Sequence, residues 1–174
     1  MHEKKKLVYS YKNLVRVFRF NIINKYLTIN NFHRIELSDA CMIIIKNINK
    51  NKYLVLKEYR AAFNSLSFGL PGGFVEKNEN PKKAIIREVF EEVNIKIFGL
   101  EKIFSYVRNG NYYGGTETIY EAKTTDLTIP KKRNLKFYWY TKKKILWLIK
   151  NKKFKTPGLI ASFLFYFKFI NKVM

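Results

Sequence analysis

A cluster of turn-forming residues near the middle of the chain constrains its fold more than any other feature. The cluster reads Gly69-Leu70-Pro71-Gly72-Gly73 and excludes a helix interior at these positions. Shortly after it, Asn80-Pro81 predicts a helix start, because Asn caps helix N-termini and Pro suits the first helical position. We expect this helix to run to about Val93 and to end at Asn94, which tolerates the left-handed conformation of a C-terminal cap.

Short apolar runs on both sides of this helix predict β-strands. Alternating apolar and polar residues in the first forty positions indicate two or three antiparallel strands. Cys41 to Lys46 and Tyr53 to Glu58, joined by a polar turn, indicate two strands that are covered on both faces. Further strands are expected near 100–107, 116–121 and 135–140, and helices near 142–150 and 157–170. These spacings predict an α/β sandwich around a mixed sheet, with residues 1–39 as an N-terminal β extension and residues 40–174 as the main domain.

Three glutamates on the central helix form a conspicuous acidic group. Glu88, Glu91 and Glu92 stand at i, i+3 and i+4, so their carboxylates share one face of a regular helix. Like charges repel there, and a hard divalent cation such as Mg²⁺ would resolve the conflict. A merely solvated helix face is the alternative. Against it, the chain has only 13 acidic residues beside 34 basic ones, yet five acids lie between Glu76 and Glu92.

The residues around this acidic group suit a supporting role. Glu79 precedes the helix, and the chain can fold back so that Arg87 reaches it and holds the loop against the helix. The glycines Gly72 and Gly73 allow the backbone to approach a metal ion and phosphates closely.

The segment from Gly73 to Ile95 resembles the Nudix box, the pattern Gly, five residues, Glu, seven residues, Arg-Glu-apolar-any-Glu-Glu-any-Gly-apolar. Asn94 replaces the last glycine, a mild departure because Asn also adopts the left-handed conformation. The resemblance implies a Nudix-type α/β/α sandwich and a Mg²⁺ cofactor, with Mn²⁺ as a substitute. It also implies that Glu88, Glu91 and Glu92 are catalytic metal ligands, with the Gly72 carbonyl as a further ligand. Structural support would come from Glu79, Arg87 and Asn94.

The flanks of the box resemble the ADP-ribose pyrophosphatase branch of that family. Glu58-Tyr59-Arg60 precedes the box, and Leu70-Pro71-Gly72-Gly73 leads into it. This branch implies hydrolysis of the diphosphate bond of nucleoside diphosphate derivatives such as ADP-ribose, which yields AMP and a sugar phosphate. ADP-ribose-specific members commonly carry a proline some fifteen residues beyond the box, where this chain has Tyr112. That difference favours a relaxed enzyme that acts on several ADP-linked compounds.

Further site residues are implied by the same resemblance. The branch uses a glutamate on a loop beyond the box to assist the attacking water, and Glu117 is the candidate here; an ordinary strand-edge acid fits that position as well. Arg60 could bind a phosphate or ribose, or could form a surface ion pair. Gly73 would approach the substrate through its backbone, and Tyr112 could stack on a base or simply cover the loop.

The net charge of +21 has two explanations. Clustered Lys and Arg attract nucleic acid or an anionic membrane, but compositional drift toward Lys, Asn, Ile, Phe and Tyr is the favoured explanation. Because the lysines are scattered along the sequence, we expect a small nucleotide substrate and no nucleic-acid partner. Two alternatives stay open: a Nudix hydrolase that acts on RNA 5′ ends, and a Nudix-fold nucleotide-binding module without catalysis.

The remaining features bear on compartment and assembly. Cys41 is the single cysteine, so the chain forms no internal disulfide and no thiolate metal cluster. No secretory segment stands at the N-terminus, and the apolar stretch from Leu159 to Ile170 is shorter than the ~20 residues that cross a bilayer. We therefore expect a cytoplasmic protein with no membrane partner. The resemblance further implies a homodimer formed through the N-terminal strands.

Overall fold

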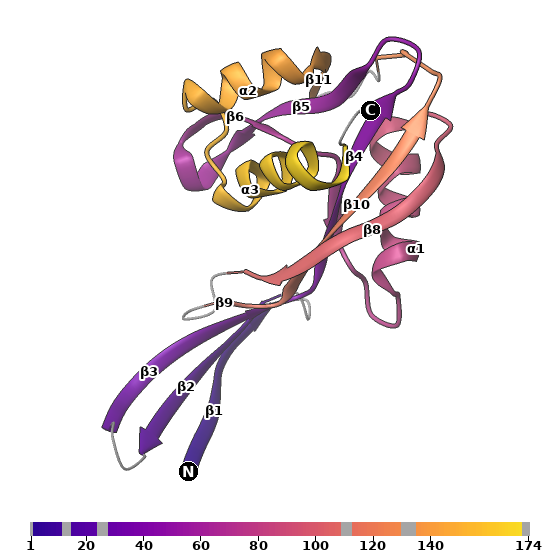
Figure 1. Ribbon diagram of the computed structural model, residues 1–174. Coiled ribbons are helices and arrows are strands. Elements are labelled where there is room, and N and C mark those ends of the chain that lie inside the picture. The colour runs from indigo at the N-terminus through magenta and orange to yellow at the C-terminus, as the bar shows by residue number, and fades with distance from the viewer. Residues whose placement is uncertain (1, 12–14, 24–27, 109–112, 130–134, 172–174) are drawn as a thin grey trace.

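A computed structural model describes residues 2–11, 15–23, 28–108, 113–129 and 135–171 of the 174-residue chain. Helices cover both faces of a central mixed sheet (Figure 1), which confirms the predicted fold class. The strands are β1 (His2–Tyr11), β2 (Val15–Ile23), β3 (Thr28–Leu37), β4 (Ala40–Asn47), β5 (Lys52–Arg60), β6 (Ser65–Gly69), β7 (Gly72–Phe74), β8 (Phe98–Val107), β9 (Tyr113–Gly114), β10 (Thr116–Thr124) and β11 (Lys136–Thr141). The helices are α1 (Pro81–Glu88), α2 (Lys142–Lys150) and α3 (Pro157–Phe165), with the 3₁₀ turn η1 (Ala61–Phe63) and the π-helical turns η2 (Val89–Val93) and η3 (Tyr166–Ile170).

The central sheet has the strand order β11-β5-β4-β10-β8. β4 pairs antiparallel with β5 at Lys46 and Asn47 only, and it runs parallel to β10 over its whole length. Nearer its start, β4 pairs with the short strand β7, while β5 pairs with β6. The two predicted strands, Cys41 to Lys46 and Tyr53 to Glu58, are thus confirmed as β4 and β5. The chain between β5 and α1 adds the strands β6 and β7 beside them.

Alternation along β4 divides the core into two hydrophobic clusters. Cys41, Ile43 and Ile45 point to the face covered by α1, whereas Ile44 points to the face covered by α2 and α3. All four side chains are fully buried. This strand is covered on both sides, as its nearly continuous apolar run predicts. Among the described residues, no helix is both long and apolar enough to cross a bilayer.

The N-terminal strands form a second sheet with the order β1-β2-β3-β9. They make an antiparallel meander that projects away from the helix-covered sheet (Figure 1). Its link to that sheet is β9, which pairs parallel with β3 at Ile35 and Glu36 and directly precedes β10. The predicted antiparallel strands are confirmed. The strand β1 was not foreseen, because three consecutive lysines, Lys4 to Lys6, disrupt its apolar pattern.

Helix α1 begins where the sequence predicts it. The side chain of Asn80 accepts a hydrogen bond from the backbone N–H of Lys83 at 2.9 Å, and Pro81 occupies the first turn. The expectation of a regular helix to Val93 is wrong in its last turn, because the π-helical turn η2 follows Glu88. The N–H of Asn94 donates to the carbonyl of Val89 at 2.8 Å, and this i to i+5 bond closes the wider turn.

The turn cluster before α1 contains strand residues at both of its ends, in β6 and β7. Gly72 has φ +146°, and a Cβ at this position would lie 2.1 Å from the backbone oxygen of Cys41. Only glycine therefore allows β7 to approach β4 this closely. The sequence predicts the turn, but the pairing of such short glycine-rich strands depends on the neighbouring strand.

We predict that Asn94→Gly leaves the free energy of unfolding unchanged or raises it by up to about 1 kcal/mol. Asn94 has φ 50° and ψ 43°, a left-handed conformation that glycine adopts without steric cost, although glycine gains entropy on unfolding. Asn94→Ala, the matched control, should lose about 1 kcal/mol. Urea denaturation measures both variants. A loss above about 1 kcal/mol in Asn94→Gly would show instead that the Asn side chain stabilises the fold.

Candidate active site

Arg87 on α1 joins the helix to the loop that precedes it. Its Nε and Nη2 atoms donate to the two carboxylate oxygens of Glu79 at 3.1 and 3.0 Å, and Nη2 also donates to the carbonyl of Phe74 at 3.0 Å. The hydrogen bonds from Arg87 hold the pKa of Glu79 below its usual range. This bidentate pair fixes the loop against the helix, so the structure brings together the two residues expected to support the site.

The same guanidinium also contacts two of the glutamates expected to bind metal. Nη1 of Arg87 lies 2.8 Å from Oε1 of Glu88 and 3.5 Å from Oε2 of Glu91. Glu88 is largely buried, whereas the Glu91 side chain is 52% exposed. Because Glu91 is solvated and its contact is long, it can leave Arg87 at little cost.

Glu88 and Glu92 converge on the two glycines of β7. A Cβ at Gly73 would lie only 2.3 to 2.9 Å from the carboxylate atoms of Glu88, so this carboxylate occupies the space that a larger residue would fill. The N–H of Gly72 donates to Oε2 of Glu92 at 3.1 Å. The absence of a side chain at Gly73 therefore gives room to the Glu88 carboxylate, and the backbone N–H of Gly72 holds that of Glu92.

Cys41 lies beneath this group on β4, opposite Gly73 in the strand register. Its Sγ donates weakly to the carbonyl of Gly73 at 3.7 Å, and its side chain is fully buried. Burial raises the pKa of the thiol to about 11. The thiol therefore stays protonated near neutral pH, and packing rather than nucleophilic chemistry explains its position.

The donor chemistry of the glutamates fits a hard divalent cation. Carboxylate oxygens are the ligands that Mg²⁺ prefers, and two of them already lie against the Gly72-Gly73 backbone. Within the described ranges, no three Asp, Glu, His or Cys side chains stand close enough together to form a ready-made metal site. The sequence predicted Glu91 on one helix face with Glu88 and Glu92. In the structure Glu91 lies against Arg87, in a π-helical turn. Cation binding would require it to rotate away from the guanidinium.

Glu117 lies at the start of β10, between β4 and β8, and is 4% exposed. This position lies within the strand predicted near 116–121 and differs from the loop position that the family resemblance implies; β10 is not an outer strand. Burial raises the pKa of Glu117, while Arg108, the Tyr106 hydroxyl and Arg60 act in the opposite direction. One of its carboxylate oxygens has no hydrogen-bond partner among the described residues.

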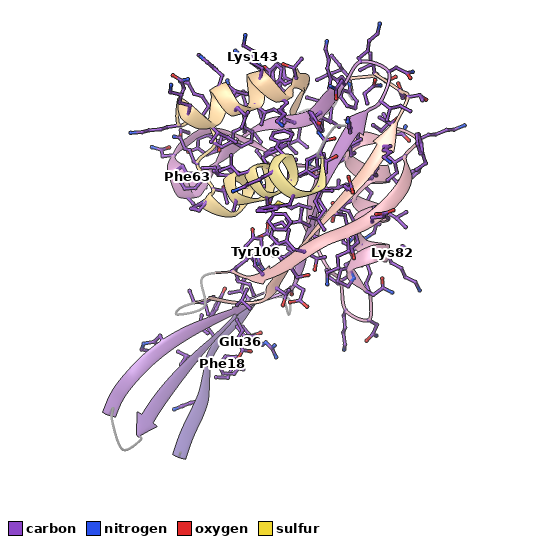
Figure 2. All side chains as sticks on the ribbon, in the orientation of Figure 1. Phe18, Glu36, Phe63, Lys82, Tyr106 and Lys143 are labelled. Carbon is purple, nitrogen blue, oxygen red and sulfur yellow. The ribbon has the colours of Figure 1, made fainter. Side chains whose placement is uncertain are left out.

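Tyr106 connects Glu117 to α3, on the face of the sheet opposite α1. Tyr106 and Glu117 are partners in the strand register, and Figure 2 shows Tyr106 between the sheet and this helix. A Cβ at Gly158, in the first turn of α3, would lie 1.9 Å from the Tyr106 hydroxyl. Burial also raises the pKa of Tyr106 above its usual range. Glu117 is thus buried beside Tyr106 on the α3 side of the sheet.

Arg108 is a site neighbour that the sequence reasoning missed. Its guanidinium lies 5.6 Å from the ring centre of Phe74 and also donates to the carbonyl of Ser38. The available signal was composition: in a chain that strongly favours Lys, an arginine is as conspicuous as an acid. Arg87, the centre of the site, shares that property.

Arg60 and Tyr112 are the two side chains that the resemblance suggests for substrate binding. Arg60 forms an ion pair with Glu58, with 2.5 Å between Nη2 and Oε1, and this matches its alternative assignment as a surface ion pair. Its position still affects Glu117, since it favours the ionised carboxylate. Tyr112 lies outside the described residues.

The sequence matches the family of NUDIX domains over residues 37–162, which is more than two thirds of the chain. The matched range includes Glu117 and the group around Arg87, namely Gly72, Gly73, Glu79, Glu88, Glu91 and Glu92. A curated protein, a methanol dehydrogenase activator of Bacillus methanolicus, is 26% identical over 84 residues. That alignment covers 48% of this chain and 45% of the activator, so the chain spans less than half the length of this relative.

We predict that Gly73→Ala retains the fold but weakens divalent-cation binding by about tenfold or more. The new methyl group meets only the flexible end of Glu88, which must rotate out of its position. Gly72→Ala is the contrasting variant, because its methyl group meets the backbone of Cys41 and should cost about 1–3 kcal/mol of stability. Calorimetric Mn²⁺ titration and urea denaturation test both. Undiminished cation binding in Gly73→Ala would show that the position of Glu88 is unimportant.

We predict that Glu117→Gln becomes more stable relative to the wild type as pH rises from 4 to 8. Burial raises the pKa of Glu117 in the folded state, so ionising it costs stability above its ordinary pKa of about 4.3. Below that pH both proteins carry a neutral group, and their difference should stay constant. Denaturation of the two proteins at a series of pH values gives this difference, and a pH-independent value would contradict a pKa that burial raises.

Proposed function

Because the chain belongs to the Nudix family, we propose that it is a Mg²⁺-dependent pyrophosphatase that hydrolyses the diphosphate bond of nucleoside diphosphate derivatives such as ADP-ribose. The products would be AMP and a sugar phosphate. The observation that carries this proposal is the convergence of Glu88 and Glu92 on the backbone of Gly72 and Gly73, with Arg87 alongside. A non-catalytic binding module has no need to retain this acidic group in so basic a chain.

Glu88, Glu91 and Glu92 would hold the cation, and the Gly72 carbonyl would lie at its edge. When bound, Mg²⁺ neutralises the charge of the pyrophosphate and lowers the pKa of water. Glu88 is positioned by the open space over Gly73 and Glu92 by the N–H of Gly72, so two ligands need little rearrangement. Pre-positioned ligands of this kind lower the entropy cost of assembling the site.

Arg87 has two sets of partners, and this arrangement suits an exchange. In the absence of a cation its guanidinium offsets the charges of Glu88 and Glu91. When a cation takes over those carboxylates, the bidentate pair with Glu79 and the bond to the Phe74 carbonyl can still hold Arg87 in place. The loop that carries the glycines would then keep its position through the reaction cycle.

Glu117 is the proposed proton acceptor for the attacking water. A general base works best when its pKa lies near the operating pH, and burial moves the pKa of this carboxyl in that direction. The nearby cations Arg108 and Arg60 favour its ionised form, which is the form that accepts a proton. Because Glu117 lies beside Tyr106 on the α3 side of the sheet, this role would require a rearrangement that brings its carboxylate and the cation site together.

ADP-ribose is proposed as the substrate because of the flanking motifs around the box. The family match supports a Nudix hydrolase in general and does not distinguish among nucleoside diphosphate derivatives. The methanol dehydrogenase activator aligns with less than half of this chain, and the alignment covers less than half of the activator. Its name therefore indicates no substrate for this chain.

The proposal predicts phosphate-coupled turnover of ADP-ribose that requires Mg²⁺. A panel of ADP-ribose, a diadenosine polyphosphate, NADH and 5′-triphosphorylated RNA, assayed with and without Mg²⁺, tests it. Cleavage of RNA alone would favour the enzyme of RNA 5′ ends. Binding of ADP-ribose without any turnover would favour the non-catalytic module.

Glu92→Gln should lower turnover by on the order of 100-fold or more, because a cation ligand contributes several kcal/mol to the transition state. The fold should be retained, since the amide can still accept from the Gly72 N–H. Glu101→Gln, at an exposed position on β8, removes the same charge and should leave turnover unchanged. Full activity in Glu92→Gln would rule out its role.

A further inference from the structure

Four lysines from two segments that are far apart in the sequence line one pocket on the α2 side of the sheet. Lys57 lies on β5, and Lys152, Lys153 and Lys155 lie on the segment that joins α2 to α3. The remaining lining residues are apolar, namely Leu66, Phe68 and Leu148, and the pocket has a volume of about 320 Å³. No carboxylate lines it, and none of the four lysines forms an ion pair within the part of the chain that the structure describes.

The backbone fixes these lysines in place. The N–H of Phe68 donates to the carbonyl of Lys153 at 3.4 Å, and the N–H of Lys155 donates to the hydroxyl of Ser67 at 3.4 Å. Phe154 is buried in the core between two exposed lysines, so both neighbouring side chains must point outward. The segment is therefore anchored to β6 and holds its charges at one rim of the pocket.

Lys152 closes the C-terminus of α2: its N–H donates to the carbonyl of Ile149 at 3.0 Å, and the N–H of Lys153 donates to the carbonyl of Leu148 at 2.9 Å. Five non-glycine residues of the described ranges have a positive φ, and four of them are asparagines: Asn51, Asn64, Asn78 and Asn94. The fifth is Lys152, with φ 55°. Asparagine adopts this conformation more readily than lysine and is abundant in this chain, so lysine at this position carries a conformational cost. The helix cap explains this conformation, and it sets the lysine at the rim of the pocket.

Exposed aromatic rings stand among these charges. Phe63, in η1, is 39% exposed, and the Nζ atom of Lys155 lies 6.0 Å from its ring centre. On α2, Trp147 is 48% exposed, and the Nζ atom of Lys144 lies 4.0 Å from its ring centre. Figure 2 shows Phe63 and Lys143 on the same side of the molecule, away from Lys82 on α1. Rings that bases can stack on, together with cations along a backbone path, are the combination that binds single strands.

We propose that this surface, formed by Lys57, Lys152, Lys153, Lys155 and Phe63, binds single-stranded nucleic acid. The lysines contact phosphates, and Phe63 stacks on an unpaired base. The surface belongs to the face covered by α2 and α3, whereas Glu88 and Glu92 belong to the face covered by α1. The surface is therefore separate from the proposed cation ligands and does not depend on them. It departs from the expectation, based on scattered lysines, that nucleic acid is not a partner.

Fluorescence anisotropy with a labelled oligouridylate of about 12 nucleotides tests the proposal across a range of salt concentrations. The triple variant Lys152→Asn/Lys153→Ala/Lys155→Ala should bind about 100-fold more weakly at 0.1 M salt, with a log–log salt slope shallower by about 2. The control triple Lys82→Ala/Lys96→Ala/Lys102→Ala removes equal charge elsewhere and should bind within about threefold of wild type. Equal weakening by both triples would overturn the proposal, because it would show diffuse attraction to the net charge.

Lys152→Asn alone provides the sharpest comparison. It should weaken oligonucleotide binding by about fivefold while the melting temperature stays equal or rises, since asparagine relieves the backbone strain. A higher melting temperature with unchanged binding would contradict the role given to Lys152.

The aromatic contribution is tested separately. Phe63→Ala should weaken binding by about tenfold, and Phe90→Ala, which removes a more exposed ring from η2 beside α1, should have no effect. Inorganic polyphosphate of matched charge should compete poorly, because it has no bases to stack. Equal competition by polyphosphate, or binding of phosphatidylserine vesicles without binding of the oligonucleotide, would overturn the assignment to single-stranded nucleic acid.

Discussion

The guanidinium of Arg87 is the interaction on which the candidate active site depends. It contacts a carboxylate from the loop before α1, a carbonyl from β7, and two carboxylates from α1 and η2. It therefore holds the loop, β7 and the helix together. Hydrogen bonds to charged groups are stronger than neutral ones, and a bidentate pair also fixes orientation. Lysine would not reproduce this planar set of donors. In a chain with so many lysines, an arginine at this position reflects the geometry that the site requires.

The central sheet separates two kinds of chemistry. On the α1 face, acidic groups approach glycine backbone, an arrangement suited to a divalent cation and a pyrophosphate. On the α2 face, lysines and exposed rings surround a pocket without carboxylates. β4 supports both faces, because its alternate side chains enter the two hydrophobic clusters. The largely buried strand β4 thus lies between the two surfaces, so they share no side chain.

The sequence alone predicts those parts of the molecule that depend on local patterns. Asn80-Pro81 and Asn94 mark the ends of the helical segment, and apolar runs identify β4 and β5. The features that depend on long-range packing were not predictable: the π-helical turn that contains Glu91, the burial of Glu117 beside Tyr106, and the meeting of Lys57 with Lys153. A strand pairing or a widened turn is decided by neighbours distant in sequence, which no local pattern encodes. The composition still indicated site residues, because acids and arginines are few in this lysine-rich chain.

The central claim is that the glutamates beside Arg87 hold a divalent cation, and electron paramagnetic resonance of added Mn²⁺ tests it most directly. Free Mn²⁺ gives a six-line signal that disappears on binding, so the titration counts bound ions without requiring a substrate. The wild-type protein should deplete this signal, and Glu88→Gln/Glu92→Gln should leave it nearly unchanged while retaining the fold. Equal depletion by both proteins, or none by the wild type, would contradict the assignment of this cluster as the metal site.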